Sequence, residues 1–345
     1  MWKARSFQKL FKAIGFGILS IEHSRNFVTF AKGRLDYDKI SLFSIFRNEI
    51  YFCESFFSHY RALGVEQFVI IDDGSTDGTY EYLLGQLDCV TLTSSLKFAD
   101  VVLLRFPNGR IRKMRAGVFL KISIPQVLFR GRTSLYVDAD EFLILPPNIL
   151  HIREVLARLR KSGQRAVLAS VVEFYPAHIS DLNTASAPGC FGDLLQQCPF
   201  YDHVQLLDLT VCGDFRKIAP SVSRRLFDSC RINSPAGGMR NSPRHKTPIL
   251  EHTGNAYRTD SHDVSVPVDG EMLLCLAHFV FTSRWEAKTR EALKRRSHSD
   301  GSAKYQLYSE LISRLKTDNS FGFCGAASRR YVGAESLLSA GLIKW

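Results

Sequence analysis

The sequence lacks the motifs of several large enzyme classes. It contains no G-x-G-x-x-G after a predicted strand and no G-x-x-x-x-G-K-[ST], which argues against a dinucleotide oxidoreductase and a P-loop enzyme. Its eight cysteines form no C-x-x-C pair, and their spacing matches no zinc pattern. Eight cysteines in 345 residues do not make a disulfide scaffold, so we expect reduced thiols and a cytosolic protein.

Acidic residues are scarce relative to basic ones. The chain has 34 Asp and Glu residues against 45 Lys and Arg residues, a formal net charge of +11. This balance favours anionic partners such as nucleotides, phosphates, acidic polymers or anionic lipid. The basic residues are scattered and no helix is typical of a recognition element, so we expect no nucleic-acid partner.

An apolar stretch near the N-terminus, Leu10 to Ile21, is too short to span a bilayer. Lys12 interrupts it, and no small-residue cleavage site typical of a signal peptide follows. Two interpretations stay open. The stretch is either a basic amphipathic helix on the inner face of an anionic membrane, or a helix packed on the domain or a leader of little order.

Short apolar runs alternate along the chain with helical patterns. This alternation predicts an α/β fold with an open, mostly parallel sheet flanked by helices. The predicted strands are 39–49, 65–73, 89–95, 100–106, 133–145 and 166–176, and the predicted helices are 50–63, 75–87, 113–129 (broken or ended near Pro125), 286–296 and 305–315. We expect a basic N-terminal segment (1–38), a sheet domain (39–284) rich in loops over 176–248, and a helical C-terminal extension (285–345) packed on the same domain.

Three predicted strands end in polar clusters, FRNE, DDGSTDGT and DADEF. Ligands of open α/β sheets bind outside the carboxyl ends of the strands, and Gly74 and Gly78 would let the chain turn sharply there. Asp138 and Asp140 are separated by one residue, so on a strand their side chains point to the same face. Two carboxylates placed in this way repel each other unless a cation lies between them. Mg²⁺ or Mn²⁺, also held by substrate phosphates, would serve, and a solvated acidic turn is the alternative.

These motifs resemble a known family. VIIDDGSTDGT followed by YVDADEF resembles the family-2-type glycosyltransferases with the GT-A fold. FRNE, His59–Tyr60 and Gly64–Val65 are similar to a bacterial branch with an RNE strand end, a histidine in the next helix and a DxDEF metal motif. Ser261–His262, Leu276–Phe281 and RWEAKTREAL resemble its late strand and the Lys-containing helix that follows. The resemblance extends loosely from Ser41 to Leu342 and implies a GT-A-like, Rossmann-type sheet.

The resemblance also implies roles for individual residues. Asp72 and Asp73 would bind the nucleoside of a nucleotide-sugar donor, and Arg47 and Glu49 would line the nucleotide side. The metal, Mn²⁺ or Mg²⁺, would be held by Asp138, Asp140 and His278, with Asp138 also near the ribose and Glu141 orienting the pair; His278 is alternatively a diphosphate contact, and His262 and His252 are weaker candidates. Ala277 before His278, and Val280 after it, depart from the family pattern.

No residue is an unambiguous catalytic base. An inverting transfer needs a carboxylate that deprotonates the acceptor hydroxyl. Asp202 in FYDHV is our first candidate, because it lies in the loop-rich stretch beside aromatic residues, and Glu173, Asp181 and Asp269 are the others. Lys246 in RHKTPIL would stabilise the leaving diphosphate, unless this stretch is a solvated basic loop.

The sequence therefore predicts a metal-dependent glycosyltransferase. It would move a sugar, with the inversion that the resemblance implies, from a nucleotide-diphosphate sugar to a hydroxyl of a glycan or lipid-linked acceptor, as in polysaccharide biosynthesis. We expect it in the cytoplasm or at the inner face of the membrane, touched through its N-terminal segment. The alternatives are an aspartyl phosphotransferase that uses the DADEF loop and a non-catalytic glycan-binding relative. A nucleotidyltransferase is less consistent, since no Gly-rich loop lies near Lys39–Arg47.

Overall fold

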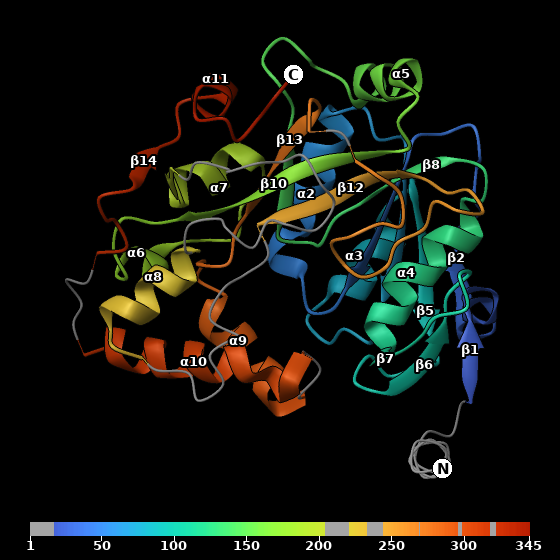
Figure 1. Ribbon diagram of the computed structural model, residues 1–345. Helices are drawn as coiled ribbons and strands as arrows, with labels where there is room; N and C mark the ends of the chain where they lie inside the picture. The colour runs from blue at the N-terminus through green and yellow to red at the C-terminus, as the bar shows by residue number, and fades with distance from the viewer. Residues whose placement is uncertain (1–16, 204–220, 233–243, 269, 296–298, 318–321) are drawn as a thin grey trace, which may run out of the picture.

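A computed structural model of the chain describes residues 17–203, 221–232, 244–268, 270–295, 299–317 and 322–345 (Figure 1). Most of the N-terminal apolar stretch, residues 10–16, lies outside these ranges, as does Asp269. Among the described residues, no helix is both long enough and apolar enough to cross a membrane. The seven described cysteines are free.

One large mixed sheet organises the fold. Its strands run in the order β14-β11-β10-β12-β8-β3-β4-β5-β2, and β13 and β9 extend it beside β10. The neighbours β8, β3, β4 and β5 are parallel, whereas β12 lies antiparallel between β8 and β10. The predicted α/β fold is confirmed. The strands of this sheet are β2 (Val28–Lys32), β3 (Ser41–Phe46), β4 (Gln67–Asp72), β5 (Cys89–Ser94), β8 (Thr133–Tyr136), β9 (Glu141–Ile144), β10 (Ala166–Tyr175), β11 (Phe200–Asp202), β12 (His245–Glu251), β13 (Leu273–His278) and β14 (Ser328–Arg330).

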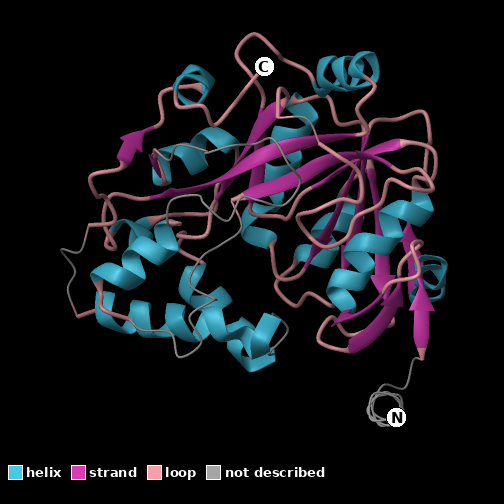
Figure 2. Cartoon of the chain, viewed as in Figure 1, coloured by secondary structure: helices cyan, strands magenta, loops and turns pink. Residues whose placement is uncertain are grey.

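Helices cover both faces of this sheet (Figure 2). Because strand side chains alternate, Leu42 and Phe46 pack into one core and Phe43 and Ile45 into the other. The first core includes helices α2, α3, α5 and α7, and the second is closed by α4. The helices are α2 (Ile50–Ala62), α3 (Thr79–Gly85), α4 (Ala116–Leu128), α5 (Ile152–Ser162), α6 (Asp181–Thr184), α7 (Phe191–Gln197), α8 (Val222–Ser229), α9 (Trp285–Arg295), α10 (Ser299–Leu315) and α11 (Ala334–Ser339).

Residues 18–32 belong to the sheet domain, which corrects the predicted boundary at residue 38. Strand β2 pairs with β5 at the edge of the large sheet, and β1 (Ile18–Ser20) pairs with β6 (Val101–Arg105), which pairs with β7 (Ile111–Arg115). A 3₁₀ helix, η1 (Ile21–Phe27), joins β1 to β2. The predicted helix over 10–21 is therefore wrong at its end, because Ile18–Ser20 is a strand.

The described part of the C-terminal segment packs on the same domain, as predicted, and also adds a strand to its sheet. Strand β14 pairs with β11, and α10 packs on α8 and α9 around the buried side chains of Phe281, Trp285 and Tyr308. Helix α9 faces the carboxyl edge of the central strands, as the site below shows. The described residues of the C-terminal segment (285–295, 299–317 and 322–345) thus complete the sheet and its edge.

Two local predictions need correction. Helix α4 continues through Pro125 to Leu128. The proline removes only one backbone hydrogen bond there, and the side chains that follow it are still buried. The single strand predicted over 133–145 is two strands, β8 and β9, separated by a turn at the DAD motif. The turn places Asp138 and Asp140 at the edge of the sheet rather than along a strand.

Candidate functional site

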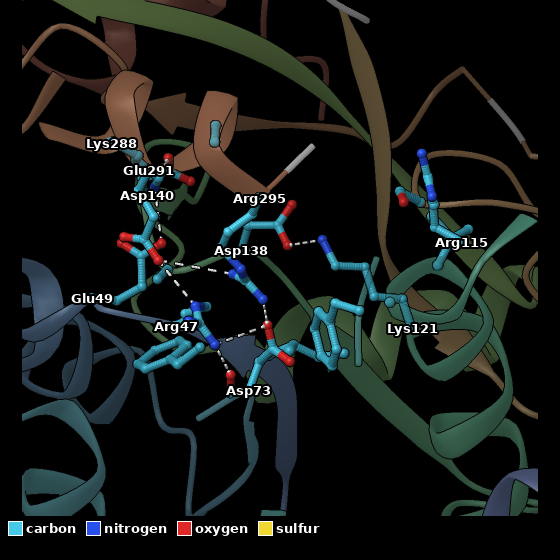
Figure 3. A pocket seen from close by; sticks show the side chains of 18 of the residues that line it. Arg47, Glu49, Asp73, Arg115, Lys121, Asp138, Asp140, Lys288, Glu291 and Arg295 are labelled. Carbon is cyan, nitrogen blue, oxygen red and sulfur yellow. Dashed lines mark hydrogen bonds and ion pairs between the residues drawn. The ribbon is translucent and has the colours of Figure 1, made fainter. Parts of the chain in front are cut away.

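Three neighbouring parallel strands, β8, β3 and β4, end at the same edge of the sheet. A cavity of about 430 Å³ opens there. Its wall contains the ends of β3 and β4, the turn after β8 and one face of α9 (Figure 3). Ten charged side chains line it, five basic and five acidic: Arg47, Arg115, Lys121, Lys288 and Arg295, and Glu49, Asp73, Asp138, Asp140 and Glu291.

The turn after β3 ties the loop after β4 to helix α9. Asn48 adopts a positive φ of 53°, a conformation that asparagine tolerates better than most residues. Its side-chain oxygen accepts from the Thr76 backbone N–H at 2.8 Å, and its amide donates to both carboxylate oxygens of Glu291 at 2.9 Å. Arg47 also donates to Glu291, at 3.0 Å. The FRNE stretch therefore fixes one wall of the cavity.

The two aspartates after β4 have different roles. Asp72 is 4% exposed, does not line the cavity, and accepts the backbone N–H groups of Gly74 and Ser75 at 2.9 and 3.0 Å. Gly74 has a φ of +73°, which this tight turn requires. Asp73 lines the cavity and meets the guanidinium groups of Arg295 at 2.5 Å and Arg47 at 3.6 Å. The predicted donor contact of Asp72 is therefore corrected to a turn-forming role, and Asp73 faces the cavity.

Two ammonium groups hold Asp138. Lys121 of α4 lies 2.6 Å from one carboxylate oxygen, which the Tyr136 hydroxyl also approaches at 3.0 Å, and Lys246 of β12 lies 2.9 Å from the other oxygen. Burial alone would raise the pKa of Asp138, but the charges of Lys121 and Lys246 outweigh it and hold the pKa well below its usual value. Asp138 is therefore a carboxylate at neutral pH.

Lys246 lies beneath the cavity rather than on its wall. Its side chain is fully buried and also pairs with Glu141, whose carboxylate accepts the Asp138 backbone N–H at 2.8 Å. Lys246 thus positions Asp138 and Glu141 from below. The structure corrects both the predicted leaving-group contact of Lys246 and the alternative of a solvated loop.

Asp140 and Glu49 share one lysine. Lys288 of α9 lies 3.0 Å from Asp140 and 2.9 Å from Glu49, while His278 at the end of β13 lies 3.7 Å from Asp140. Burial raises the pKa of Glu49 to about 7, although Lys288 opposes this. Burial acts in the same direction on Asp140, but Lys288 and His278 hold the pKa of Asp140 below its usual value. Burial would lower the pKa of His278, and the Asp140 carboxylate raises it instead.

Arg47 and Lys246 were predicted as site residues, but three other basic partners of these carboxylates were given no role from the sequence. Lys121 comes from α4, and Lys288 and Arg295 come from α9. The positions 288, 291 and 295 lie three and four residues apart and so share one face of a helix. This helical spacing is the feature of the sequence that could have indicated the α9 residues as part of the site.

The predicted base lies elsewhere. Asp202 is 3% exposed, accepts from the Tyr175 hydroxyl at 2.5 Å and pairs with Arg225 at 2.9 Å; it is not on the cavity wall. Among the alternatives, Glu173 is buried against Ser223 and Arg244, and Asp181 accepts the His178 backbone N–H. The structure therefore corrects the prediction of Asp202 as the base, since that buried carboxylate pairs with the partly exposed guanidinium of Arg225.

Of the three histidines predicted as site residues, two lie on the cavity wall and one lies in the core. His278 and His262 line the cavity, together with Ser261. His252 is fully buried between Ser134 and Gln126, at 2.8 and 3.0 Å, and reaches no metal position.

The three residues of the predicted metal site lie on one cavity wall. Asp138, Asp140 and His278 all line the cavity, and their oxygen and nitrogen atoms suit Mn²⁺ or Mg²⁺. However, ammonium groups engage both oxygens of Asp138 and one oxygen of Asp140. Within the described ranges, no group of three such side chains is arranged to hold a metal ion. In this arrangement the side chains do not fit a metal ion, because ammonium groups occupy the carboxylate oxygens. The metal is therefore still only a prediction from the sequence.

An apolar patch completes the cavity wall. Phe98, Val118 and the backbone of Gly117 line it near Lys121 and Arg115. A Cβ atom at Gly117 would lie 2.8 Å from the Phe98 ring, so only glycine allows α4 to approach this ring. The cavity thus combines a flat apolar surface, suited to a planar ring, with charges of both signs.

Comparisons with known proteins leave the family open. No family model matches the chain, and no curated protein matches it. Among solved structures, a UTP-bound UGPase from Acinetobacter baumannii is 10% identical, with 88% of this chain and 92% of that chain covered and a TM-score of 0.28. A mycobacterial protein is 14% identical, with 84% and 83% covered and a TM-score of 0.28. A UDP-glucose pyrophosphorylase, also from Acinetobacter baumannii, has 10% identity, the same coverage as the first and a TM-score of 0.25. At these TM-scores the likeness supports no statement about activity.

Proposed function

We propose that the chain is a family-2-type glycosyltransferase. It would transfer a sugar from a nucleotide-diphosphate sugar to a hydroxyl group of a glycan or lipid-linked acceptor. One observation supports this most: the FRNE, DDGSTDGT and DADEF stretches, which are far apart in the sequence, meet in one cavity. Inversion at the anomeric carbon follows from the resemblance alone.

The charges suit both halves of such a donor. Carboxylates such as Asp73 and Asp138 accept hydrogen bonds from ribose hydroxyl groups, and the flat patch beside Gly117 would take a nucleobase. The leaving diphosphate gains negative charge as the sugar departs, and preorganised cations stabilise that charge. Lys288 and Arg295 supply such cations from one face of α9.

The aspartyl phosphotransferase alternative has less support. Its nucleophile would be a carboxylate oxygen of the DADEF loop, and both oxygens of Asp138 are engaged by ammonium groups. The position that such loops give to a small hydroxyl residue holds Phe142, a fully buried ring packed on Phe279 and Phe191.

Titration calorimetry with UDP, GDP, ADP and CDP tests the proposal, each with Mn²⁺ and with EDTA. The variants are Asp140→Ala and, as a matched control, Asp228→Ala, an exposed aspartate of α8. We expect one nucleotide to bind preferentially, Asp140→Ala to change its affinity or its metal dependence, and Asp228→Ala to behave as wild type. Absence of binding for all four nucleotides would contradict the proposal, and turnover of p-nitrophenyl phosphate would favour the phosphotransferase.

A further inference from the structure

Every described carboxylate on the cavity wall is held by a cation. Lys288 lies 2.9 Å from Glu49 and 3.0 Å from Asp140. The other pairs are Asp138 with Lys121 at 2.6 Å, Asp73 with Arg295 at 2.5 Å, and Glu291 with Arg47 at 3.0 Å. The adjacent cations hold the pKa of Asp138, Asp140 and Glu291 below the ordinary value and weaken these three as proton acceptors. At Asp73 and Glu49 burial outweighs the cation and raises the pKa, to about 7 for Glu49, which is therefore the rival base on this wall. The proposed transfer nevertheless requires a base.

His262 lies on the same wall. It belongs to the loop between β12 and β13 and lines the cavity beside Ser261. Two further contacts anchor the loop, since the Asp260 carboxylate accepts the His262 backbone N–H at 2.7 Å and the His262 carbonyl accepts the Thr247 backbone N–H at 3.1 Å. The imidazole is therefore held on a fixed segment.

The hydrogen bond of the ring defines its tautomer. His262 Nδ1 lies 2.9 Å from the backbone carbonyl oxygen of His245. A carbonyl oxygen only accepts, so Nδ1 carries the proton, and in the neutral ring Nε2 holds a free lone pair. Among the described residues, Nε2 has no hydrogen-bond partner. It is also not one of the fully buried polar atoms, so its lone pair is accessible from the cavity.

We propose that His262 is the general base of the transfer, an assignment that rests on the proposed function. Nε2 of His262 accepts the proton of the acceptor hydroxyl while the hydroxyl oxygen forms its bond to the anomeric carbon. The bond from that carbon to the donor phosphate oxygen breaks, and its electron pair leaves with the nucleoside diphosphate. The proton on Nε2 is then released to water. An imidazole here takes the place of the carboxylate that sequence analysis expected.

The surroundings keep this imidazole neutral at pH 7. Burial lowers the pKa of His262, and the charge of Lys246 lowers it further. Glu141, the carbonyl of His245 and Asp138 act in the opposite direction and do not outweigh them. The nearest other imidazole, His245, is turned to Asp263, with its Nε2 at 2.7 Å from that carboxylate. Because the base form predominates at pH 7, the rate should fall only as the pH drops below about 6.5, the ordinary histidine value.

The test has two arms on the full chain. The first is ¹⁵N NMR of histidine-labelled protein, with the His262 signals assigned from their loss in His262→Gln. We expect the Nδ1–H tautomer, with Nε2 titrating below pH 6.5. An Nε2–H tautomer at neutral pH would overturn the proposal.

The second arm measures nucleoside diphosphate release from UDP-glucose, GDP-mannose, ADP-glucose and dTDP-glucose. It compares wild type, His262→Gln, Glu49→Gln as the rival base, and His178→Gln, an exposed histidine, as the control. We expect His262→Gln to lower kcat by about 10²- to 10⁴-fold, and to lose the acidic limb of the pH profile, while the Kd for the nucleoside diphosphate stays within about threefold. His178→Gln should behave as wild type.

The outcomes separate the two proposals. If His262→Gln keeps kcat within about threefold, or loses nucleotide binding together with activity, His262 is not the base and the proposed function stands. If Glu49→Gln alone removes the rate, Glu49 is the base. If wild type binds no nucleoside diphosphate, the proposed function fails and the assignment of His262 fails with it.

Discussion

The ends of β4 and β8 each place two aspartates after a buried apolar strand, but their counterions differ. At the end of β4, Asp72 forms a turn and Asp73 meets the guanidinium groups of Arg47 and Arg295. At the end of β8, the carboxylates meet the ammonium groups of lysines from α4, β12 and α9. A guanidinium holds two acceptors in a fixed plane, whereas an ammonium is a compact charge that rotates freely. The β4 end is therefore built to keep one geometry, and the β8 end can exchange partners when a polyanion enters.

The largest expected effect comes from Lys246, beneath the β8 end. Lys246→Met leaves Glu141, whose side chain is 4% exposed, without its cation. Breaking a buried ion pair on one side costs about 3–5 kcal/mol, so we expect a loss of that size in the free energy of unfolding by urea. The double variant with Glu141→Gln should recover part of it. The control is Lys39→Met, whose side chain is 47% exposed and pairs with Asp36, and it should change stability by less than about 0.5 kcal/mol. Equal effects of the two lysine variants would show that Lys246 is not essential to the β8 end.

The next effect is a change in acid sensitivity. The folded pKa of Asp140 lies below its unfolded value, so its stabilisation is present above about pH 4 and is lost as the pH falls through the folded pKa. In Asp140→Asn this contribution is absent at every pH. The fall in unfolding free energy from pH 6 to pH 3 should therefore be smaller than in wild type by on the order of 1–2 kcal/mol. Asp228→Asn, at an exposed position, serves as the control, and an unchanged pH dependence in Asp140→Asn would contradict the pairing with Lys288.

A conservative exchange at the β4 end should have a smaller effect. Arg295→Lys keeps the charge but loses the planar group that reaches Asp73 at 2.5 Å and Glu291 at 3.9 Å. We expect a loss of about 1 kcal/mol in unfolding free energy. Arg290→Lys on the same helix, 73% exposed, should cost less than about 0.5 kcal/mol. If both exchanges are neutral, the guanidinium plane does not define the β4 end.

The smallest effect concerns Mn²⁺ in the absence of nucleotide. Lys288 occupies one oxygen of Asp140, so it competes with a cation for that carboxylate. Lys288→Met should strengthen Mn²⁺ binding by about threefold, roughly 0.6 kcal/mol, measured by calorimetry. Lys316→Met, exposed and paired with Glu286, is the control. If wild type already binds Mn²⁺ tightly and Lys288→Met weakens it, the ammonium group does not compete with the metal.

Local sequence patterns predicted the central strands and the site edge, but not the strands β1, β2, β7, β11, β12 and β14. The runs Ser41–Phe46 and Gln67–Asp72 are strands in which every residue is buried, and DDGSTDGT predicted the turn at Gly74. The prediction of Asp202 as the base was wrong because the same letters, an aspartate beside aromatic residues, also describe a buried partner of Arg225. Distinguishing the two requires knowing where Arg225 lies, which no local pattern contains.

The sequence by itself determined which strands end in acids, because apolar runs must be buried and the charges that follow them must emerge at an edge. Only the tertiary structure decided which cations meet those acids. Asp138 is paired with Lys121, 17 residues away, and with Lys246, 108 residues away, while Asp140 is paired with Lys288, 148 residues away. Strand order and helix packing bring these lysines to one edge of the sheet. The same packing turns His262 into the cavity and removes Asp202 from it. Electrostatic partners depend on distance in space, and sequence separation does not report that distance.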